Sequence, residues 1–313
     1  MADAPAPSFA PDALDLGEVR RAFDQAAASY DAHAVLQRVV CDRLLERLDY
    51  TTLKPGRVLD IGCGTGYGLA QLRERYAEAT LHALDLAPAM LAAARARLPR
   101  PSWAQRALQA FVPPSNATHL VCADMARLPL AANSMHLVWS SLALQWAQDL
   151  EAVFKGFHRV LAPGGLLMFA TFGPDTLKEL RSAFAAIDDA PHVNRFTDLH
   201  DIGDMLVHAG YASPVMEMEM VTLTYADLKA LMRDLKAIGA HNAAAARRRG
   251  LFGKTAWAKL EAAYEVHRRE DRLPATFEVI YGHAWAGDKT QREDGRQVIQ
   301  WQIGERRRRA GLA

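Results

Sequence analysis

Residues 58–66 read Val-Leu-Asp-Ile-Gly-Cys-Gly-Thr-Gly, so a short apolar run is followed directly by three alternating glycines. Glycine tolerates positive φ angles and has no Cβ, so such a loop can turn sharply and lie against a ligand before a helix begins. A dinucleotide-binding loop would read G-x-G-x-x-G, but here Gly66 comes one residue early. Asp60 precedes the loop, where a carboxylate would repel a pyrophosphate but could accept hydrogen bonds from an amino acid's ammonium group. The segment therefore predicts an α/β fold whose first turn binds S-adenosylmethionine rather than NAD.

Two further acidic residues follow the next two predicted strands. Residues 80–84 form an apolar run that ends at Asp85, which we expect to hold ribose hydroxyls, as an acid at the tip of the second strand does in open α/β sheets. Asp124 ends the third run, where it could accept the adenine amino group while Met125 lies against the ring. An isolated Asp is more often a cap or turn residue, but three acids at successive strand ends favour a site. The predicted cofactor-binding residues are Asp60, Gly62, Cys63, Gly64, Gly66, Asp85, Leu86, Met90, Asp124, Met125 and Ser140.

Composition limits the classes of partner and compartment. The chain has 313 residues, 50% of them hydrophobic, and a formal net charge of +1, so it can bury a substantial core and has no general affinity for nucleic acid. Its three scattered cysteines suit a reducing compartment and suggest neither a disulfide framework nor a metal site. No apolar run approaches the roughly 20 residues of a membrane span, and the N-terminus lacks a basic targeting region. We therefore expect a cytoplasmic protein without membrane segments.

The order of predicted elements indicates an α/β fold with a mostly parallel sheet and helices on both faces. Strands and helices alternate from residue 57 to about 225, after two helices near 17–28 and 34–48. Two late strands, near 215–225 and 276–285, enclose helices at about 226–238 and 255–268, which together with the N-terminal helices could cover the pocket as a lid. The predicted parts are a disordered N-terminus (1–15), a helical cap (16–50), the cofactor-binding domain (51–290, with a helical insertion at about 226–272) and a tail (291–313).

From about residue 57 to 171 the chain resembles class I S-adenosylmethionine-dependent methyltransferases, which implies a Rossmann-like sheet of seven strands. A closer resemblance covers nearly the whole chain. The segments that carry it are 22–27 with Tyr30 and His33, 36–38, 139–146, 191–196 and 235–240. Together they resemble the malonyl-acyl-carrier-protein O-methyltransferases of biotin synthesis. That resemblance implies methylation of the free carboxylate of a malonyl thioester, which yields S-adenosyl-L-homocysteine and an ester that primes pimeloyl synthesis. The chain departs from the shorter family members at 99–118, at the Arg-rich segment 247–254 and in its tail.

The implied reaction needs positioning more than acid–base chemistry, because a malonyl carboxylate is already ionised at neutral pH. Orienting two reactants can contribute up to about 7 to 11 kcal/mol. Arg195 is our preferred anchor for the carboxylate, although a structural ion pair is an equally good interpretation. The histidines are more often structural than catalytic, and an aromatic at a strand–helix junction usually packs in the core. The predicted catalytic residues are Tyr30, His33, Gln145, Trp146, His192 and Arg195.

Acyl carrier proteins are strongly acidic, so the resemblance also implies a basic docking patch near the pocket. Its candidate residues are Arg233, Lys236, Arg247, Arg248, Arg249 and Lys254. A solvated helix face explains any one of them equally well.

Three other functions remain open from the sequence. A small-acid carboxyl methyltransferase, such as one acting on trans-aconitate, would share the fold and chemistry. A quinone C-methyltransferase would need a base and a hydrophobic pocket. The Arg-rich segment and residues 273–276 are also similar to methyltransferase-like assembly factors of respiratory complexes, some of which hydroxylate an arginine.

Overall fold

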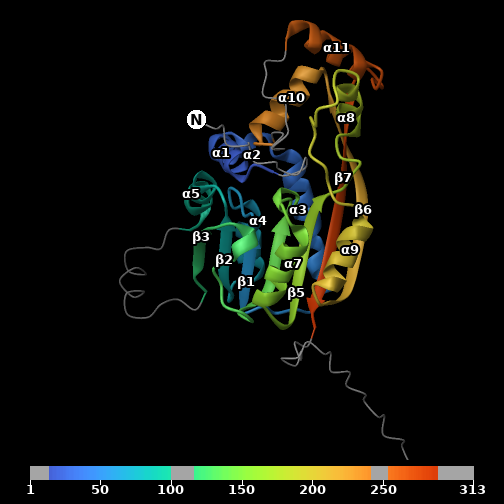
Figure 1. The fold of residues 1–313 in the computed structure, drawn as a ribbon. Coiled ribbons are helices and arrows are strands. Elements are labelled where there is room, and N and C mark those ends of the chain that lie inside the picture. The colour runs from blue at the N-terminus through green and yellow to red at the C-terminus, as the bar shows by residue number, and fades with distance from the viewer. Residues whose placement is uncertain (1–13, 100–115, 241–252, 288–313) are drawn as a thin grey trace, which may run out of the picture.

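The computed structural model describes residues 14–99, 116–240 and 253–287 (Figure 1). Residues 1–13 of the predicted N-terminal segment, the predicted tail, the centre of the 99–118 insertion and residues 241–252 lie outside the described residues. One sheet of seven strands forms the framework, in the order β3-β2-β1-β4-β5-β7-β6. Its strands are β1 (Arg57–Ile61), β2 (Thr80–Asp85), β3 (Thr118–Cys122), β4 (Met135–Ser141), β5 (Leu161–Phe172), β6 (Tyr211–Tyr225) and β7 (Leu273–Ala286).

The sheet is parallel except at β7, which pairs antiparallel with both β5 and β6. The predicted seven-stranded, mostly parallel sheet is therefore confirmed. β1 and β4 are buried along nearly their whole length, as their continuous apolar runs require for strands covered on both faces. Because β1, β2 and β4 run in one direction, their carboxyl ends meet at one edge.

Helices cover both faces of this sheet, as predicted. On one face, α7 (Leu150–Val160) and α9 (Leu199–His208) bury Phe154, Phe157 and Leu206 in one core. A second core gathers apolar side chains of helices on the other face and at the carboxyl edge. Those helices are α3 (Val35–Arg47), α4 (Tyr67–Arg75), α5 (Pro88–Arg97), α8 (Lys178–Ala185), α10 (Leu228–Ala237) and α11 (Lys254–Glu265).

The N-terminal region forms α1 (Leu16–Ala26), the short α2 (Tyr30–His33) and α3, so the two predicted helices are present and the residues between them form a helical turn of their own. α1 packs against α5, and α2 contacts α10. The Ser29 hydroxyl donates a hydrogen bond to the Ala237 carbonyl at 3.2 Å. The N-terminal helices and the late helices therefore meet above the carboxyl edge of the sheet (Figure 1).

Three strand boundaries differ from the predicted ones. β5 begins at Leu161, so the Pro-Gly-Gly turn expected before it lies within the strand, where its pairing with β4 is irregular and Gly164 has a φ of +71°. β6 begins at Tyr211 and β7 at Leu273, both earlier than predicted. A bulge between Ala212 and Val215 breaks the alternation of side chains along β6. The sequence pattern therefore did not indicate that the residues before Val215 belong to this strand. None of the described helices is long and apolar enough to cross a membrane.

Candidate active site

The glycine loop between β1 and α4 has the backbone conformation that its sequence predicts. Gly62, Gly64 and Gly66 have φ angles of +70°, +51° and +84°. A Cβ on Gly62 would lie 2.2 Å from the Cβ of Ala143, and one on Gly66 would lie 3.0 Å from Ala94. Side chains at these two positions would therefore clash as well as strain the backbone. The loop can lie close to a ligand because it carries no side chains at these points.

Two buried carboxylates flank the loop. Asp85 accepts hydrogen bonds from the backbone N–H groups of Gly64 at 2.9 Å and Ala87 at 2.8 Å. Burial raises the pKa of Asp85, although these N–H groups oppose the rise. Asp60 is 3% exposed, and burial, followed by the nearby charge of Asp85, raises its pKa to about 7. An acid with so high a pKa is stabilised in its charged form by a bound cation.

Each carboxylate lines a small pocket. The Asp60 pocket, of about 60 Å³, is also lined by Gly62, Cys63 and Gly64, whereas Gly66 packs against Ala94 and lines neither small pocket. The Asp85 pocket, of about 80 Å³, is lined by four more predicted cofactor residues, which are Leu86, Met90, Asp124 and Met125. Asp124 also accepts a hydrogen bond from the Ala126 N–H at 2.9 Å, so it caps a short helix, η2 (Met125–Arg127), in addition to lining this pocket.

Ser140 lines neither small pocket. Its side chain is fully buried, and its hydroxyl donates a hydrogen bond to the Ile61 carbonyl at 3.1 Å. Ser141 lines both pockets instead. Successive side chains of a strand point to opposite faces, which explains why the two neighbouring serines differ. The structure therefore favours Ser141 over the predicted Ser140 as a pocket residue.

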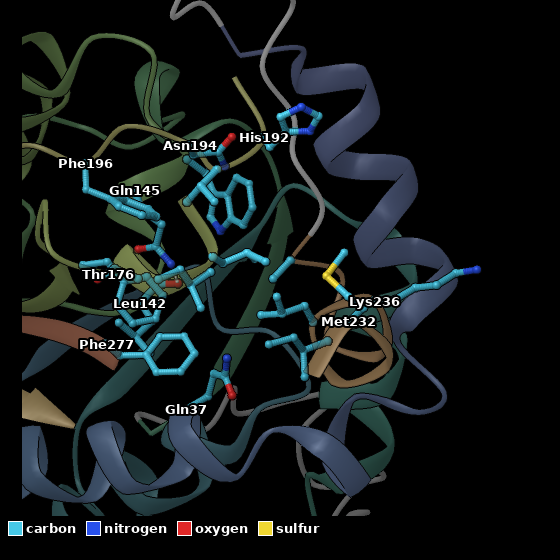
Figure 2. A pocket seen from close by; sticks show the side chains of 18 of the residues that line it. Gln37, Leu142, Gln145, Thr176, His192, Asn194, Phe196, Met232, Lys236 and Phe277 are labelled. Atoms are coloured by element: carbon cyan, nitrogen blue, oxygen red, sulfur yellow. Dashed lines mark hydrogen bonds between the residues drawn. The ribbon is translucent and has the colours of Figure 1, made fainter. Parts of the chain in front are cut away.

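A third space, a cavity of about 500 Å³ that we call the large cavity, is shown in Figure 2. The N-terminal helices, η3 (Leu144–Trp146), the segment 191–196 and the late helices all contribute to its lining. Most of its lining is aliphatic or aromatic, including Phe172, Phe277 and Met232. It shares Tyr30 with both small pockets, so the three spaces meet at this side chain.

Four of the six predicted catalytic residues line the large cavity, namely Tyr30, Gln145, Trp146 and His192. Burial, followed by the charge of Asp85, raises the pKa of Tyr30, so its hydroxyl is a neutral donor. Gln145 donates a hydrogen bond from Nε2 to the Leu142 carbonyl at 2.7 Å. Trp146 packs edge-to-face on Phe23, with ring centroids 5.4 Å apart. It therefore has the packing role that aromatic residues usually have, and it also forms part of the wall.

His192 is held by two contacts at the cavity wall. Its Nε2 lies 2.6 Å from Oδ1 of Asp188, and its ring stacks on Phe184 with centroids 4.0 Å apart. These contacts fit a structural histidine. His33 lines none of the three cavities described above, and its Nδ1 lies 3.0 Å from the Ser29 carbonyl oxygen. The structure therefore does not bring His33 together with the other candidates.

Arg195 lies apart from the large cavity. It is exposed and lines a neighbouring space of about 240 Å³, the side cavity. Asn194 lines both spaces. Two amide residues of the large cavity, Gln37 and Asn194, were not singled out from the sequence, although both fall within the segments that carried the family resemblance. Uncharged amides have no distinctive pattern along a chain, so only the fold identifies them.

Three residues of the predicted basic patch are described. Arg233 and Lys236 are exposed on α10, and Lys254 is exposed at the start of α11. The remaining members, residues 247–249, lie outside the described residues. Within the described part of the chain, no group of three His, Cys, Asp or Glu side chains could hold a metal ion.

Comparisons with known proteins agree with this geometry. A family model described as a methyltransferase domain matches residues 59–169, which span the sheet from β1 to β5. A Laribacter hongkongensis protein named malonyl-[acyl-carrier protein] O-methyltransferase is 57% identical over 290 residues, which cover 92% of this chain and 96% of that protein. This chain belongs to the malonyl-[acyl-carrier protein] O-methyltransferase family. A second family member, from Gallionella capsiferriformans, is 54% identical over 91% of this chain and 96% of its own.

Solved structures place the family within a wider fold. A complex between the Haloferax volcanii Trm112 methyltransferase activator and a methyltransferase contains a chain that superposes with a TM-score of 0.53 at 18% identity, covering 88% of this chain and 100% of that one. At this identity the likeness concerns the fold alone. The malonyl-[acyl-carrier protein] O-methyltransferase family therefore has the Rossmann-like class I methyltransferase fold, as the sequence predicts.

Proposed function

We propose that this protein transfers a methyl group from S-adenosyl-L-methionine to the free carboxylate of a malonyl thioester on acyl carrier protein. The observation that carries the proposal is the 57% identity, over 92% of the chain, to a protein named for this activity. The products would be S-adenosyl-L-homocysteine and a malonyl methyl ester that primes pimeloyl synthesis for biotin. The cytoplasm, where acyl carrier protein and reduced thiols coexist, is the proposed compartment.

The residues around the glycine loop fit S-adenosyl-L-methionine. Its amino-acid end carries an ammonium group, and the pKa of about 7 at buried Asp60 makes this carboxylate a good acceptor for such a cation. Asp85, at the end of β2, is held by backbone N–H groups at both oxygens, and each oxygen has a further lone pair that could accept from a ribose hydroxyl. Met125 and Asp124 would lie beside the adenine ring. We assign the cofactor site to these residues with the glycine loop, Cys63, Leu86, Met90 and Ser141.

When bound, S-adenosyl-L-methionine supplies a methyl carbon made electrophilic by its sulfonium sulfur. The protein needs no general base for the reaction, because the malonyl carboxylate is already ionised. Its task is to hold a carboxylate oxygen in line with the methyl carbon and to exclude water, which contributes to the rate through orientation. The apolar walls of the large cavity, among them Phe172 and Phe277, suit the exclusion of water.

The carrier protein would approach the late helices, where Arg233, Lys236 and Lys254 are exposed. Lys236 also lines the large cavity, so this basic surface adjoins the place where the acyl group would enter. Exposed cations opposite an acidic partner chiefly raise the association rate, and salt weakens their effect. We therefore propose these lysines and this arginine, with Arg247, Arg248 and Arg249, as the docking patch.

The test is transfer of labelled methyl from S-adenosyl-L-methionine to malonyl-acyl carrier protein, with malonyl-CoA and trans-aconitate in parallel. Asp85→Ala is the control for dependence on the cofactor site. Methyl ester on the malonyl thioester, absent from the control, would support the proposal. Transfer to trans-aconitate alone would replace it with a small-acid methyltransferase, and no transfer to any acid would refute it. Growth without biotin of a bacterium lacking its own malonyl methyltransferase, after expression of this chain, tests the pathway.

A further inference from the structure

The polar groups that line the large cavity are mostly neutral. Its amide side chains are Gln37, Gln145 and Asn194, and no arginine is among the described residues that line it. Lys236 contributes its alkyl stem, while Figure 2 shows its ammonium end directed away from the cavity. Arg195 lines only the side cavity. A carboxylate that enters this space would therefore meet neutral hydrogen-bond donors first.

Gln37 occupies the boundary between the two reactants. Among the described residues, it and Tyr30 alone line both the large cavity and the Asp60 pocket. Gln37 lies in the first turn of α3, and Cys41, one turn later on the same helix face, also lines the Asp60 pocket. The amide thus lies where the amino-acid end of the methyl donor would adjoin the acceptor.

The orientation of the Gln37 amide suits two ligands at once. Figure 2 shows its nitrogen directed into the large cavity and its oxygen turned away. This oxygen, Oε1, is buried and has no hydrogen-bond partner within the described residues. Buried amide oxygens almost always have a partner, so an unpaired one indicates a group that a bound molecule completes. An ammonium group near Asp60 is such a donor, and Nε2 then remains available to an anion.

We propose that Gln37 binds the attacking carboxylate, with its Nε2–H donating to one carboxylate oxygen while the other oxygen attacks. The new O–C bond forms as the methyl carbon–sulfur bond breaks, and that electron pair stays on sulfur, so no proton moves. A neutral amide orients the anion while removing less of its nucleophilicity than a close arginine pair would. The inference rests on the proposed function for the identity of the acceptor. It assigns to Gln37 the role that the sequence suggested for Arg195.

The test compares how tightly malonyl- and acetyl-acyl carrier protein bind to the protein loaded with S-adenosyl-L-homocysteine. Acetyl lacks the carboxylate, so the difference in affinity isolates the carboxylate contact. Gln37→Glu keeps the size of the side chain but places a negative charge at the site. A hydrogen bond to a charged group corresponds to about 10- to 100-fold in affinity, so we expect the variant at pH 8 to lose a malonyl preference of this size. Lower pH should restore part of the preference as the new carboxyl group becomes protonated.

Two controls separate this contact from a structural effect. Gln25→Glu makes the same change on the exposed side of α1, outside all four cavities described above, and should leave the malonyl preference intact. Gln37→Leu removes the donor without adding charge and should also lose the preference. Affinity for S-adenosyl-L-homocysteine should be unchanged in Gln25→Glu. In the two Gln37 variants it can change, because Oε1 of Gln37 adjoins the ammonium group, so malonyl- and acetyl-acyl carrier protein are compared on protein saturated with S-adenosyl-L-homocysteine, where such a change cancels.

The outcomes distinguish this inference from the proposed function. A wild-type protein that transfers methyl to malonyl thioester, but whose malonyl preference survives Gln37→Glu, refutes the inference alone. Loss of the preference in Arg195→Gln, with Gln37→Glu unaffected, also overturns it and restores Arg195 as the anchor. A wild-type preference that depends on Gln37, without methyl transfer, supports the carboxylate site while refuting the proposed function. A wild-type protein with neither transfer nor preference refutes both.

Discussion

Replacing Asp60 by asparagine should stabilise the ligand-free protein at pH 8. Burial and the charge of Asp85 raise the pKa of Asp60 from its ordinary 3.8 to about 7. Below pH 3.8 the carboxyl group is protonated in both folded and unfolded chains, so it costs nothing. Between pH 3.8 and 7 the unfolded chain ionises this carboxyl group while the folded protein keeps it protonated, so the free energy of unfolding falls by about 1.4 kcal/mol for each pH unit. Above pH 7 both states are ionised, and the loss stays at about 4 kcal/mol. Asparagine has nearly the same shape and avoids this cost.

The same substitution should weaken cofactor binding, since the asparagine no longer attracts an ammonium group. For the wild-type protein, affinity for S-adenosyl-L-homocysteine should rise with pH up to about 7, because binding below this pH must first release the proton from Asp60. Titration calorimetry at pH 6 in two buffers of different ionisation enthalpy measures this release, which should approach one proton. The Asp60→Asn variant should release far less.

Urea denaturation at pH 4 and pH 8 provides the assay for stability, with and without S-adenosyl-L-homocysteine. We expect the variant to match the wild type at pH 4, to exceed it by about 4 kcal/mol at pH 8 without ligand, and to gain less from the ligand. A variant less stable than the wild type at pH 8 would refute the argument that ionised Asp60 is destabilising without a bound cation. Equal affinity of the wild type and the variant for S-adenosyl-L-homocysteine would refute the assignment of Asp60 to the ammonium group.

Three further predictions concern the loop, the carrier and the side cavity. Gly62→Ala should lower the melting temperature far more than Gly64→Ala. A Cβ at residue 62 would lie 2.2 Å from the Cβ of Ala143, whereas one at residue 64 meets nothing within 4 Å. Equal losses would mean that backbone strain alone matters. Reversing Arg233 and Lys236 to Glu should raise the KM for malonyl-acyl carrier protein several-fold at low salt and much less at high salt, with kcat nearly unchanged. Arg195→Ala should keep kcat/KM within about threefold, since Arg195 lies outside the large cavity, and a loss of about 100-fold would return it to the site.

The cofactor half of the site could be predicted from sequence because its signals are local. Asp60 and the alternating glycines are adjacent in the chain, and Asp85 follows a strand that pairs in parallel with β1. Once two strands are parallel, their carboxyl ends share an edge, so residues that follow them come together without any knowledge of packing. The mostly parallel sheet follows from the same pattern, and its seven strands from the family resemblance.

The acceptor half depends on contacts between distant segments, and in each half of the site a residue next to a predicted one lines the cavity. Ser141 rather than Ser140 lines the small pockets, and Asn194 lines the large cavity whereas Arg195 does not. Neighbouring side chains in extended backbone point to opposite sides, and the sequence near these positions does not specify which side faces the site. Gln37 was missed for another reason, since an amide on a helix becomes informative only when its surroundings are known.

The hairpin of β6 and β7 has a consequence for the diversification of this fold. Tyr225, the last residue of β6, pairs with Leu273, the first residue of β7, so the intervening helices leave and rejoin the sheet at adjacent points. A segment whose ends already meet can be lengthened, shortened or exchanged with little change in the entropy of closing the loop. Its described residues include Met232 and Leu260 of the large cavity, and none of those described residues lines the two small pockets. An engineer could replace this connection with the corresponding segment of another methyltransferase, which would change the acceptor while the cofactor half of the site stays the same.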